Sequence, residues 1–259
     1  MADQEKSSQK GKAIIINGAT RGLGLALAKI VANSPDFHVI CLVRDMNHLS
    51  GLEPIKDHID ILECDYSKIE KTCGFRQFSQ MGPDKYSHVY FINNVSDCLP
   101  VGRLGKLDPA EIAKSITVNI SSNVIILNNF LNIILQNNVG ASILNISSGI
   151  AQNPVAGLGL YGLGKAAMDY MATVLKKEAI ENTVRVSTFY PGGMDTDMQS
   201  KLQSQLKASD DLKKFNYDAI YDQKISSPLS VAKIIHDNFL IGDNGWQKAI
   251  SKKYDYPDS

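Results

Sequence analysis

Short apolar runs alternate with longer helical stretches along most of this sequence, and this alternation limits the possible fold more than any other feature. Six apolar runs are predicted to be strands: Ala13–Ile16, His38–Val43, Ile59–Glu63, His88–Ile92, Ser142–Ile146 and Val184–Phe189. Helices are predicted at Leu23–Ala32, Asp108–Leu135 and Tyr161–Ile180. Strands without polar alternation suit a parallel sheet that is covered on both faces. The expected fold is therefore α/β: a single-domain, doubly wound parallel sheet of about seven strands with helices on both faces.

Charge and composition exclude several classes of protein. Lys+Arg and Asp+Glu both number 27, so the formal net charge is zero and nothing global favours nucleic acid as a partner. The polar segment Met1–Gly11 is predicted to be a flexible tail, followed by one domain over residues 12–259. That tail has no apolar signal core, and no apolar run approaches the roughly 18 residues that a membrane span needs. We therefore expect a cytoplasmic protein without a membrane anchor.

The four cysteines do not suggest a metal site or a disulfide framework. Cys41, Cys64, Cys73 and Cys98 include no C-x-x-C pair, and no histidine pair flanks them at metal-ligand spacing. Cys41 lies within an apolar run, so it is predicted to be a small buried core residue.

The first predicted strand leads directly into a glycine-rich loop. Glycines at 18, 22 and 24 give the spacing G-x-x-x-G-x-G. They let the backbone approach a pyrophosphate, and the following helix offers free N–H groups and the positive end of its dipole. A tight strand–helix turn without a ligand has the same glycines, but the βαβ context favours a dinucleotide site. The predicted cofactor contacts in this loop are Gly18, Thr20, Arg21, Gly22, Leu23 and Gly24.

The end of the second strand indicates which dinucleotide binds. A carboxylate there typically contacts the ribose of NAD, whereas a 2′-phosphate requires a cation. Arg44 ends this strand and Arg21 lies in the glycine loop, so two guanidinium groups favour NADP(H). Asp45 leaves NAD open as the alternative. Asp65 follows the third strand and is predicted either to contact the adenine or to cap the next helix.

A serine, a tyrosine and a lysine form the most specific motif. Ser148 ends the fifth strand, Tyr161 comes thirteen residues later, and Lys165 follows four residues after that. On a helix Tyr161 and Lys165 share one face, where the ammonium is expected to lower the pKa of the phenol. Ser148 would polarise a substrate carbonyl and Tyr161 would donate the proton. The alternative is a pair of surface residues on a helix.

Two other segments are predicted to complete this site. Asn119 lies within the long fourth helix, where an amide can open the helical hydrogen bonding and hold a water that relays protons to Lys165. A Pro-Gly turn follows the sixth strand, and Thr196 after it is placed to bind the nicotinamide carboxamide, with Met194 and Met198 beside it. The polar stretch Asp197–Gln223 is interpreted as a helical flap over the site or as a surface insertion.

Taken together, these motifs resemble the short-chain dehydrogenases/reductases over about residues 12–250, which implies a Rossmann-type fold. The family's asparagine segment after the fourth strand is matched by Asn93 and Asn94, but Val95 and Ser96 stand where alanine and glycine are usual. The resemblance implies that Asn93 contacts the cofactor, and that the catalytic group is Ser148, Tyr161, Lys165 and Asn119. Tyr161 and Lys165 would also touch the cofactor. The resemblance implies no metal ion at this site.

Within the family, the sequence is most similar to the sepiapterin reductases. That similarity implies NADPH-dependent reduction of pterin side-chain ketones, in the last part of tetrahydrobiopterin synthesis. Ser148, Gly149, Tyr161 and Gly192 match positions that border the substrate, and Asp255 is the candidate anchor for the pterin amino edge. The alternatives are a reductase of benzil-like diketones and a non-catalytic NADP-binding regulator.

The helix after Tyr161 also predicts self-association. Its apolar residues spread wider than one buried stripe: Ala166, Ala167, Tyr170, Met171, Val174 and Leu175. Family members usually pair through their fourth and fifth helices, so we expect a homodimer or a dimer of dimers. A fully buried helix has the same pattern.

Overall fold

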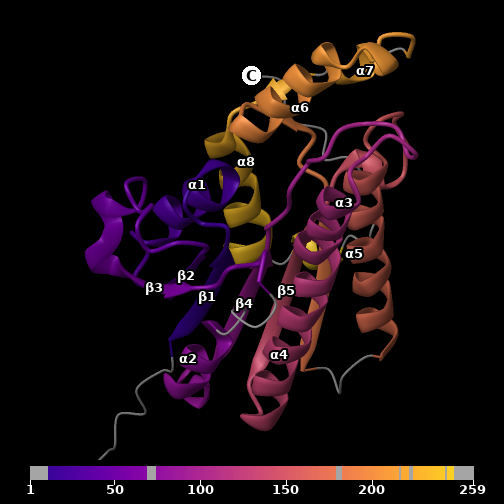
Figure 1. Cartoon of the computed structure of the whole chain (residues 1–259). Coiled ribbons are helices and arrows are strands. Elements are labelled where there is room, and N and C mark those ends of the chain that lie inside the picture. Colours follow the sequence, from indigo (N-terminus) through magenta and orange to yellow (C-terminus); the bar gives the residue numbers. More distant parts are fainter. Residues whose placement is uncertain are drawn as a thin grey trace, which may run out of the picture.

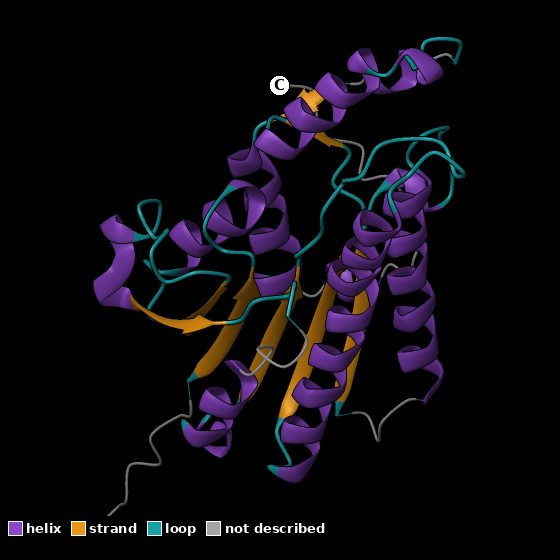
Figure 2. Ribbon diagram, in the orientation of Figure 1, coloured by secondary structure: helices purple, strands orange, loops and turns teal. Residues whose placement is uncertain are grey.

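A parallel sheet forms the centre of the protein (Figures 1 and 2). The computed structural model describes residues 11–68, 74–178, 183–215, 217–221, 224–242 and 244–247. Within them the sheet has six strands in the order β3-β2-β1-β4-β5-β6. The strands are β1 (Lys12–Asn17), β2 (Phe37–Val43), β3 (Ile59–Glu63), β4 (His88–Asn93), β5 (Gly140–Ile146) and β6 (Val184–Phe189). All six predicted strands are confirmed, whereas the described sheet has one strand fewer than the seven expected.

The helices cover both faces of this sheet. The helices of the described residues are α1 (Gly22–Val31), α2 (Gly74–Gln80), α3 (Pro109–Ile116), α4 (Ser122–Gln136), α5 (Gly159–Glu178), α6 (Asp197–Ala208), α7 (Asp218–Tyr221), α8 (Pro228–Ile235) and α9 (Asn244–Gln247). Residues of α1 and α8 pack on one face and residues of α2, α4 and α5 on the other. A short parallel pair, β7 (Gly193–Met194) and β8 (Ile225–Ser226), lies apart from the sheet. The strand order changes direction between β1 and β4, and ligands of doubly wound sheets bind outside the carboxyl ends of the strands at that point.

Alternation along β1 divides the apolar core into two layers. Ile14 and Ile16 belong to the layer that includes residues of α1 and α8. Ala13 and Ile15 belong to the opposite layer, with residues of α2, α4 and α5. Successive side chains of a strand point to opposite faces, so an unbroken apolar strand supplies both layers at once. This is the reason that the apolar runs of the sequence predict a sheet covered on both sides.

Side-chain caps explain where several of the helices begin. The Asp108 carboxylate accepts a hydrogen bond from the backbone N–H of Ala110 at 2.8 Å and starts α3. Ser227 does the same for α8 with the N–H of Ser230 at 3.1 Å, and Pro228 occupies the first turn. Both patterns satisfy N–H groups that a helix leaves unpaired at its start.

The continuous helix Pro109–Gln136 is long and apolar enough to cross a membrane, by length and composition only. No apolar run of that length was expected from the sequence. Its apolar residues Ile126, Phe130 and Ile134 are buried in the layer that packs on the sheet. A core helix of the fold therefore accounts for its composition.

A third, smaller apolar cluster lies beyond the carboxyl ends of the strands. It joins Leu202 and Leu206 of α6 and Leu212 to Ile150 and Leu158, which lie between β5 and α5. Helices α6 and α7 occupy the top of Figure 1, away from the body of the sheet. The described part of the predicted flap, residues 197–215 and 217–221, is thus largely helical and lies beyond the strand ends, as expected for a flap.

Candidate active site

One large cavity lies between the strand ends and the flap. Its volume is about 1350 Å³, more than the roughly 300–1,000 Å³ of a typical small-molecule pocket. Residues of the glycine loop, of the ends of β4, β5 and β6, and of α6 line it. This space is enough for a dinucleotide together with a second small molecule.

The glycine loop forms the wall at the end of β1. Gly18 and Gly22 have φ angles of +66° and +56°, which side chains rarely tolerate. A Cβ atom on Gly24 would lie 2.4 Å from the carbonyl oxygen of Gly18. Each of the three glycines is therefore required by the geometry of this turn.

The start of α1 offers unpaired donors to a phosphate group. Arg21 is the N-cap residue, and no side chain caps this helix. Thr20, Arg21, Gly22 and Leu23 all line the cavity. An uncapped helix start facing a cavity is a common pyrophosphate site, so the loop fits the dinucleotide predicted from the sequence.

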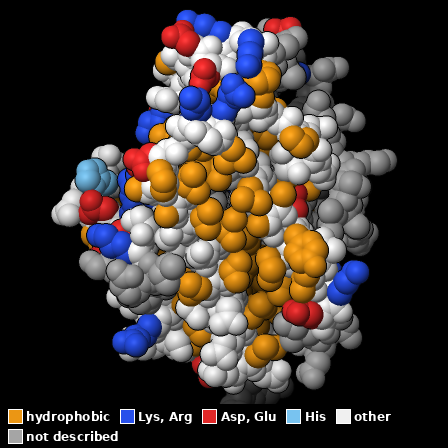
Figure 3. All heavy atoms as spheres, turned by 45° about the vertical axis from the view of Figure 1, so that its right-hand side comes forward, with side chains coloured by type: hydrophobic (Ala, Val, Ile, Leu, Met, Phe, Trp, Pro, Cys, Tyr) orange, Lys and Arg blue, Asp and Glu red, His pale blue; other side chains and the backbone are white. Residues whose placement is uncertain are grey.

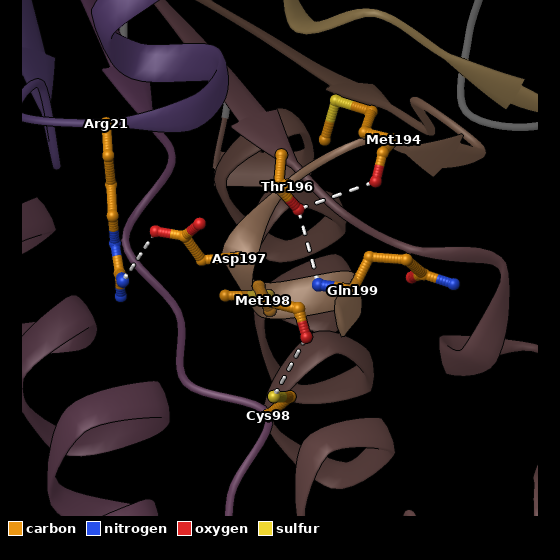
Figure 4. Close-up of polar contacts among 7 residues, drawn as sticks. All are labelled: Arg21, Cys98, Met194, Thr196, Asp197, Met198 and Gln199. Atoms are coloured by element: carbon orange, nitrogen blue, oxygen red, sulfur yellow. Dashed lines mark hydrogen bonds and ion pairs between the residues drawn. The ribbon is translucent and has the colours of Figure 1, made fainter. Parts of the chain in front are cut away.

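Arg44 and Arg21 both line the cavity, but Asp45 does not. The Asp45 carboxylate accepts hydrogen bonds from the N–H of Asn47 at 2.8 Å and from His48 Nδ1 at 2.8 Å. The carboxylate is therefore already hydrogen-bonded within the turn that follows β2. Arg21 forms a 3.5 Å ion pair with Asp197 at the start of α6, which joins the glycine loop to the flap (Figure 4).

Two of the predicted cofactor residues lie behind the cavity wall. Asp65 Oδ1 accepts hydrogen bonds from Ser67, both from its backbone N–H at 2.9 Å and from its hydroxyl at 2.7 Å. Asn93 is 4% exposed, accepts a hydrogen bond from Asn17 at 2.9 Å and donates one to Asn145 at 3.4 Å. The cavity is lined instead by their neighbours Cys64, Tyr66, Ser67, Asn94, Val95 and Ser96.

Asn17 is a structural residue of the site that the sequence reasoning missed. Its side-chain oxygen accepts hydrogen bonds from the N–H groups of Asn94 and Val95, the latter at 2.9 Å. Asn94 in turn donates to the Asn17 carbonyl at 3.1 Å. Asn17 thereby fixes the segment after β4 against the glycine loop. A polar residue at the end of an otherwise apolar strand was the signal for it.

Tyr161 and Lys165 lie one turn apart near the start of α5, and Ser148 follows β5. All three line the cavity. The Lys165 ammonium donates a hydrogen bond to the Ile146 carbonyl at 2.7 Å and lies 5.9 Å from the centre of the Tyr161 ring. The structure therefore brings the predicted Ser–Tyr–Lys group together.

The protonation of this group differs from the expectation. Burial raises the pKa of Tyr161 to about 12, and the Ser148 hydroxyl only partly opposes that rise. Burial lowers the pKa of Lys165 to about 8, with Asp169 opposing it. The expected lowering of the phenol pKa by Lys165 is not found, because burial raises this pKa and the Ser148 hydroxyl, not the Lys165 ammonium, is the group that opposes the rise. A phenol that stays protonated at neutral pH is the form that a proton donor requires.

Asn119 lies in the π-helical turn Thr117–Ser121, between α3 and α4. Its side-chain oxygen accepts hydrogen bonds from the Ser96 hydroxyl at 3.0 Å and from the Asp97 N–H at 2.8 Å. Its amide donates to the Asp97 carbonyl at 2.9 Å. The predicted break in helical hydrogen bonding is present. Ser96, where the family usually has glycine, serves as a donor that fixes this amide.

The turn after β6 brings the remaining predicted residues to the cavity wall. Gly192, which has a φ of +71°, Met194, Thr196 and Met198 all line it. The Thr196 hydroxyl accepts the Gln199 N–H at 3.3 Å and so caps α6 (Figure 4). Gly149 and Ser148 also line the cavity. Asp255 lies outside the described residues.

Comparison with known proteins defines the family. Residues 12–207 match the family model for short chain dehydrogenases. The chain therefore belongs to the short-chain dehydrogenase family of oxidoreductases.

Several individual proteins are similar over most of their length. Benzil reductase ((S)-benzoin forming) of Bacillus subtilis is 29% identical over 199 residues, which are 74% of this chain and 79% of that protein. Sepiapterin reductase of Meriones unguiculatus is 31% identical over 199 residues, 71% of this chain and 75% of that protein. The crystal structure of the KRED1-Pglu enzyme has a TM-score of 0.73 at 25% identity, covering 92% of this chain and all of that one.

Proposed function

We propose that this protein is an NADPH-dependent reductase of pterin side-chain ketones, acting in the last part of tetrahydrobiopterin synthesis. The observation that supports it most is the meeting of Ser148, Tyr161 and Lys165 at one cavity with the glycine loop. The likeness to sepiapterin reductase supports the pterin assignment.

The choice of NADPH over NADH rests on the end of β2. Arg44 lines the cavity, while the Asp45 carboxylate is occupied by Asn47 and His48. A guanidinium group is a planar fork of donors that suits a phosphate, whereas an NAD site needs a carboxylate free to reach the ribose hydroxyls. Arg44 together with Arg21 would hold the 2′-phosphate.

When bound, the cofactor supplies the hydride that reduces the carbonyl. Ser148 orients and polarises the carbonyl oxygen, and Tyr161 transfers its hydroxyl proton to that oxygen. The charged Lys165, held by the Ile146 carbonyl, stabilises the phenolate that the transfer leaves behind. Asn119 fixes the segment after β4 beside them, and Thr196 and Gly192 shape the opposite wall.

A reductase of benzil-like diketones is the second candidate. The likeness to benzil reductase of Bacillus subtilis favours it. The two functions need the same catalytic group and differ in whether the pocket recognises the amino edge of a pterin. Oxidation of NADPH with sepiapterin beside benzil tests them directly. A clear preference for sepiapterin supports the pterin function, and use of benzil alone supports the second candidate. If neither is reduced, the catalytic proposal fails and a non-catalytic NADP-binding role replaces it.

The face formed by α4 and α5 supports self-association. Tyr170 is 70% exposed and Leu163 is 50% exposed on α5, and Leu135 of α4 is 44% exposed. Apolar side chains gather on the face shown in Figure 3. We propose a homodimer or a dimer of dimers through this face. Light scattering should then give a particle of at least twice the 28.4 kDa chain mass.

A further inference from the structure

A polar cluster lies next to the catalytic lysine, on the side away from Tyr161. Asp169 follows Lys165 by one turn of α5, so both side chains lie on the same helix face. Tyr190 donates its hydroxyl to Asp169 Oδ2 at 2.8 Å, and Asn145 donates its amide to Asp169 Oδ1 at 3.3 Å. Both oxygens of this half-buried carboxylate are thus held by donors from other elements.

The cluster extends to the cavity. Gln152 donates its amide to the Tyr190 hydroxyl at 3.0 Å, and both Gln152 and Tyr190 line the cavity. A continuous path of hydrogen bonds therefore runs from the cavity wall through Tyr190 to Asp169.

Lys165 needs a source of negative charge to stay protonated. Its side chain is 7% exposed, and its ammonium has the uncharged Ile146 carbonyl as its hydrogen-bond partner. Burial lowers the pKa of Lys165, and the Asp169 carboxylate is the group that opposes this effect.

The other titratable groups around this cluster are tyrosines and a thiol. Tyr161 lies on α5 itself, Cys98 acts on Tyr161 from the segment after β4, and Tyr190 follows β6. The neighbouring strand β5 presents Asn145 and the Ile146 carbonyl, and Ser147 follows it directly; none of these groups is charged. Among the described residues, Asp169 is therefore the carboxylate that acts on the lysine.

We propose that Asp169 is a positioning residue that keeps the Lys165 ammonium charged during turnover, and that Tyr190 and Gln152 hold its carboxylate in place. This role rests on the proposed function of Tyr161 and Lys165. It adds to the catalytic group a carboxylate that touches neither substrate nor cofactor and acts through the lysine alone.

The sign of the pH dependence follows from this role. Reduction requires charged Lys165, so activity is lost as the pH rises through the pKa of this lysine. A nearby carboxylate raises that pKa, and its removal moves the loss of activity to lower pH. Burial also raises the pKa of Asp169, and hydrogen bonds from the Ser147 and Tyr190 hydroxyls oppose that rise. Loss of the Tyr190 hydroxyl therefore acts in the same direction as loss of the carboxylate, but more weakly.

The experiment is a pH profile of kcat/KM for NADPH-dependent carbonyl reduction. The Asp169→Asn variant keeps the shape of the side chain and an oxygen that accepts the Tyr190 hydroxyl. We expect the apparent pKa of the alkaline limb of its kcat/KM profile to fall by about one unit. Above that pKa the value of kcat/KM would then be roughly tenfold lower than that of the unchanged protein. Asp169→Glu should restore most of the shift. Asp36→Asn is the matched control, because it removes one exposed carboxylate at the far end of the sheet.

A purely structural role predicts a different result. It would lower kcat by the same factor at every pH, and an unshifted limb in Asp169→Asn overturns the proposal. If that variant does not fold, Tyr190→Phe decides: a smaller shift in the same direction supports the role, and no shift overturns it. Failure of the proposed function itself is distinguishable, since the unchanged protein would then oxidise NADPH with neither sepiapterin nor benzil at any pH.

Discussion

The two walls of the cavity are built in different ways. The wall on the side of the sheet consists of strand ends joined by buried amides, with Asn17 at 0% and both Asn93 and Asn145 at 4% exposure. The wall on the side of the flap is α6, a largely polar helix with two buried residues, Leu202 and Leu206. The wall on the side of the sheet is part of the folded core, whereas α6 packs on that core from outside.

This difference separates the chemistry from the selection of substrate. Ser148, Tyr161 and Lys165 all belong to β5 and α5 or follow them directly, so their positions depend on the sheet. The flap is held by the small cluster around Leu206, by the Arg21–Asp197 ion pair and by a hydrogen bond from the Cys98 thiol to the Met198 carbonyl (Figure 4). Substitutions in the flap can therefore alter what the cavity accepts without disturbing the reacting groups.

The largest effect is expected from a change on the fixed wall. Tyr161→Phe should lower kcat by about 10²- to 10⁴-fold, because it removes the proton donor. Binding of NADPH, measured by fluorescence titration, should remain close to that of the unchanged protein, since the glycine loop is untouched. A variant that keeps more than half of its activity would remove Tyr161 from this role.

A matched pair of core substitutions compares the walls directly. Ile16→Ala in β1 and Leu206→Ala in α6 both truncate side chains that are at most 1% exposed, and such changes cost about 2–5 kcal/mol. We expect Ile16→Ala to lower the free energy of global unfolding in urea. Leu206→Ala should instead increase hydrogen exchange in α6 and leave most of the global stability intact. Equal losses of global stability would mean that flap and sheet unfold together.

The pair of arginines is expected to affect the choice of cofactor. Replacing both Arg21 and Arg44 with alanine should weaken NADPH use by roughly 1.5–3 kcal/mol, the range for hydrogen bonds to charged groups. The KM for NADH should change little, because NADH lacks the 2′-phosphate. Equal losses with the two cofactors would contradict this assignment.

The smallest effect is expected at the ion pair between the walls. The side chains of Arg21 and Asp197 are 59% and 72% exposed, so the pair contributes at most about 1 kcal/mol to stability. Asp197→Asn should leave the melting temperature almost unchanged and modestly tighten NADPH binding, because Arg21 no longer has a competing carboxylate. The gain should shrink as salt is added. Weaker NADPH binding in this variant would show that the ion pair assists the cofactor site.

The strands and the glycine loop could be predicted closely from the sequence because their signals are local. Unbroken apolar runs predict buried parallel strands, and glycines before a helix predict a turn that only glycine tolerates. The Ser148, Tyr161 and Lys165 group followed from spacing, and the helical break followed from the amide of Asn119 inside a long predicted helix.

The parts that were missed depend on contacts between distant segments. The cluster of Asp169, Tyr190 and Gln152 joins three elements, and none of the three residues is unusual in its own stretch. The pKa of Tyr161 was expected to fall, because spacing shows the lysine but not the depth of burial. The side-chain partners of Asp65 and Asn93, which are Ser67 for the first and Asn17 and Asn145 for the second, could not be read from the sequence either, while their contact with a cofactor stays a prediction.

The π-helical turn Thr117–Ser121 also sets the phase between two helices. Buried positions run at 115, 119, 123 and 127, three successive steps of four residues. In a straight α-helix each such step advances the buried face by about 40° around the axis. The wider turn absorbs that rotation, so Ser115 and Phe130 both face inward. Loss of a single residue here would rotate α3 by about 100° relative to α4 and carry Asn119 away from the segment that it holds.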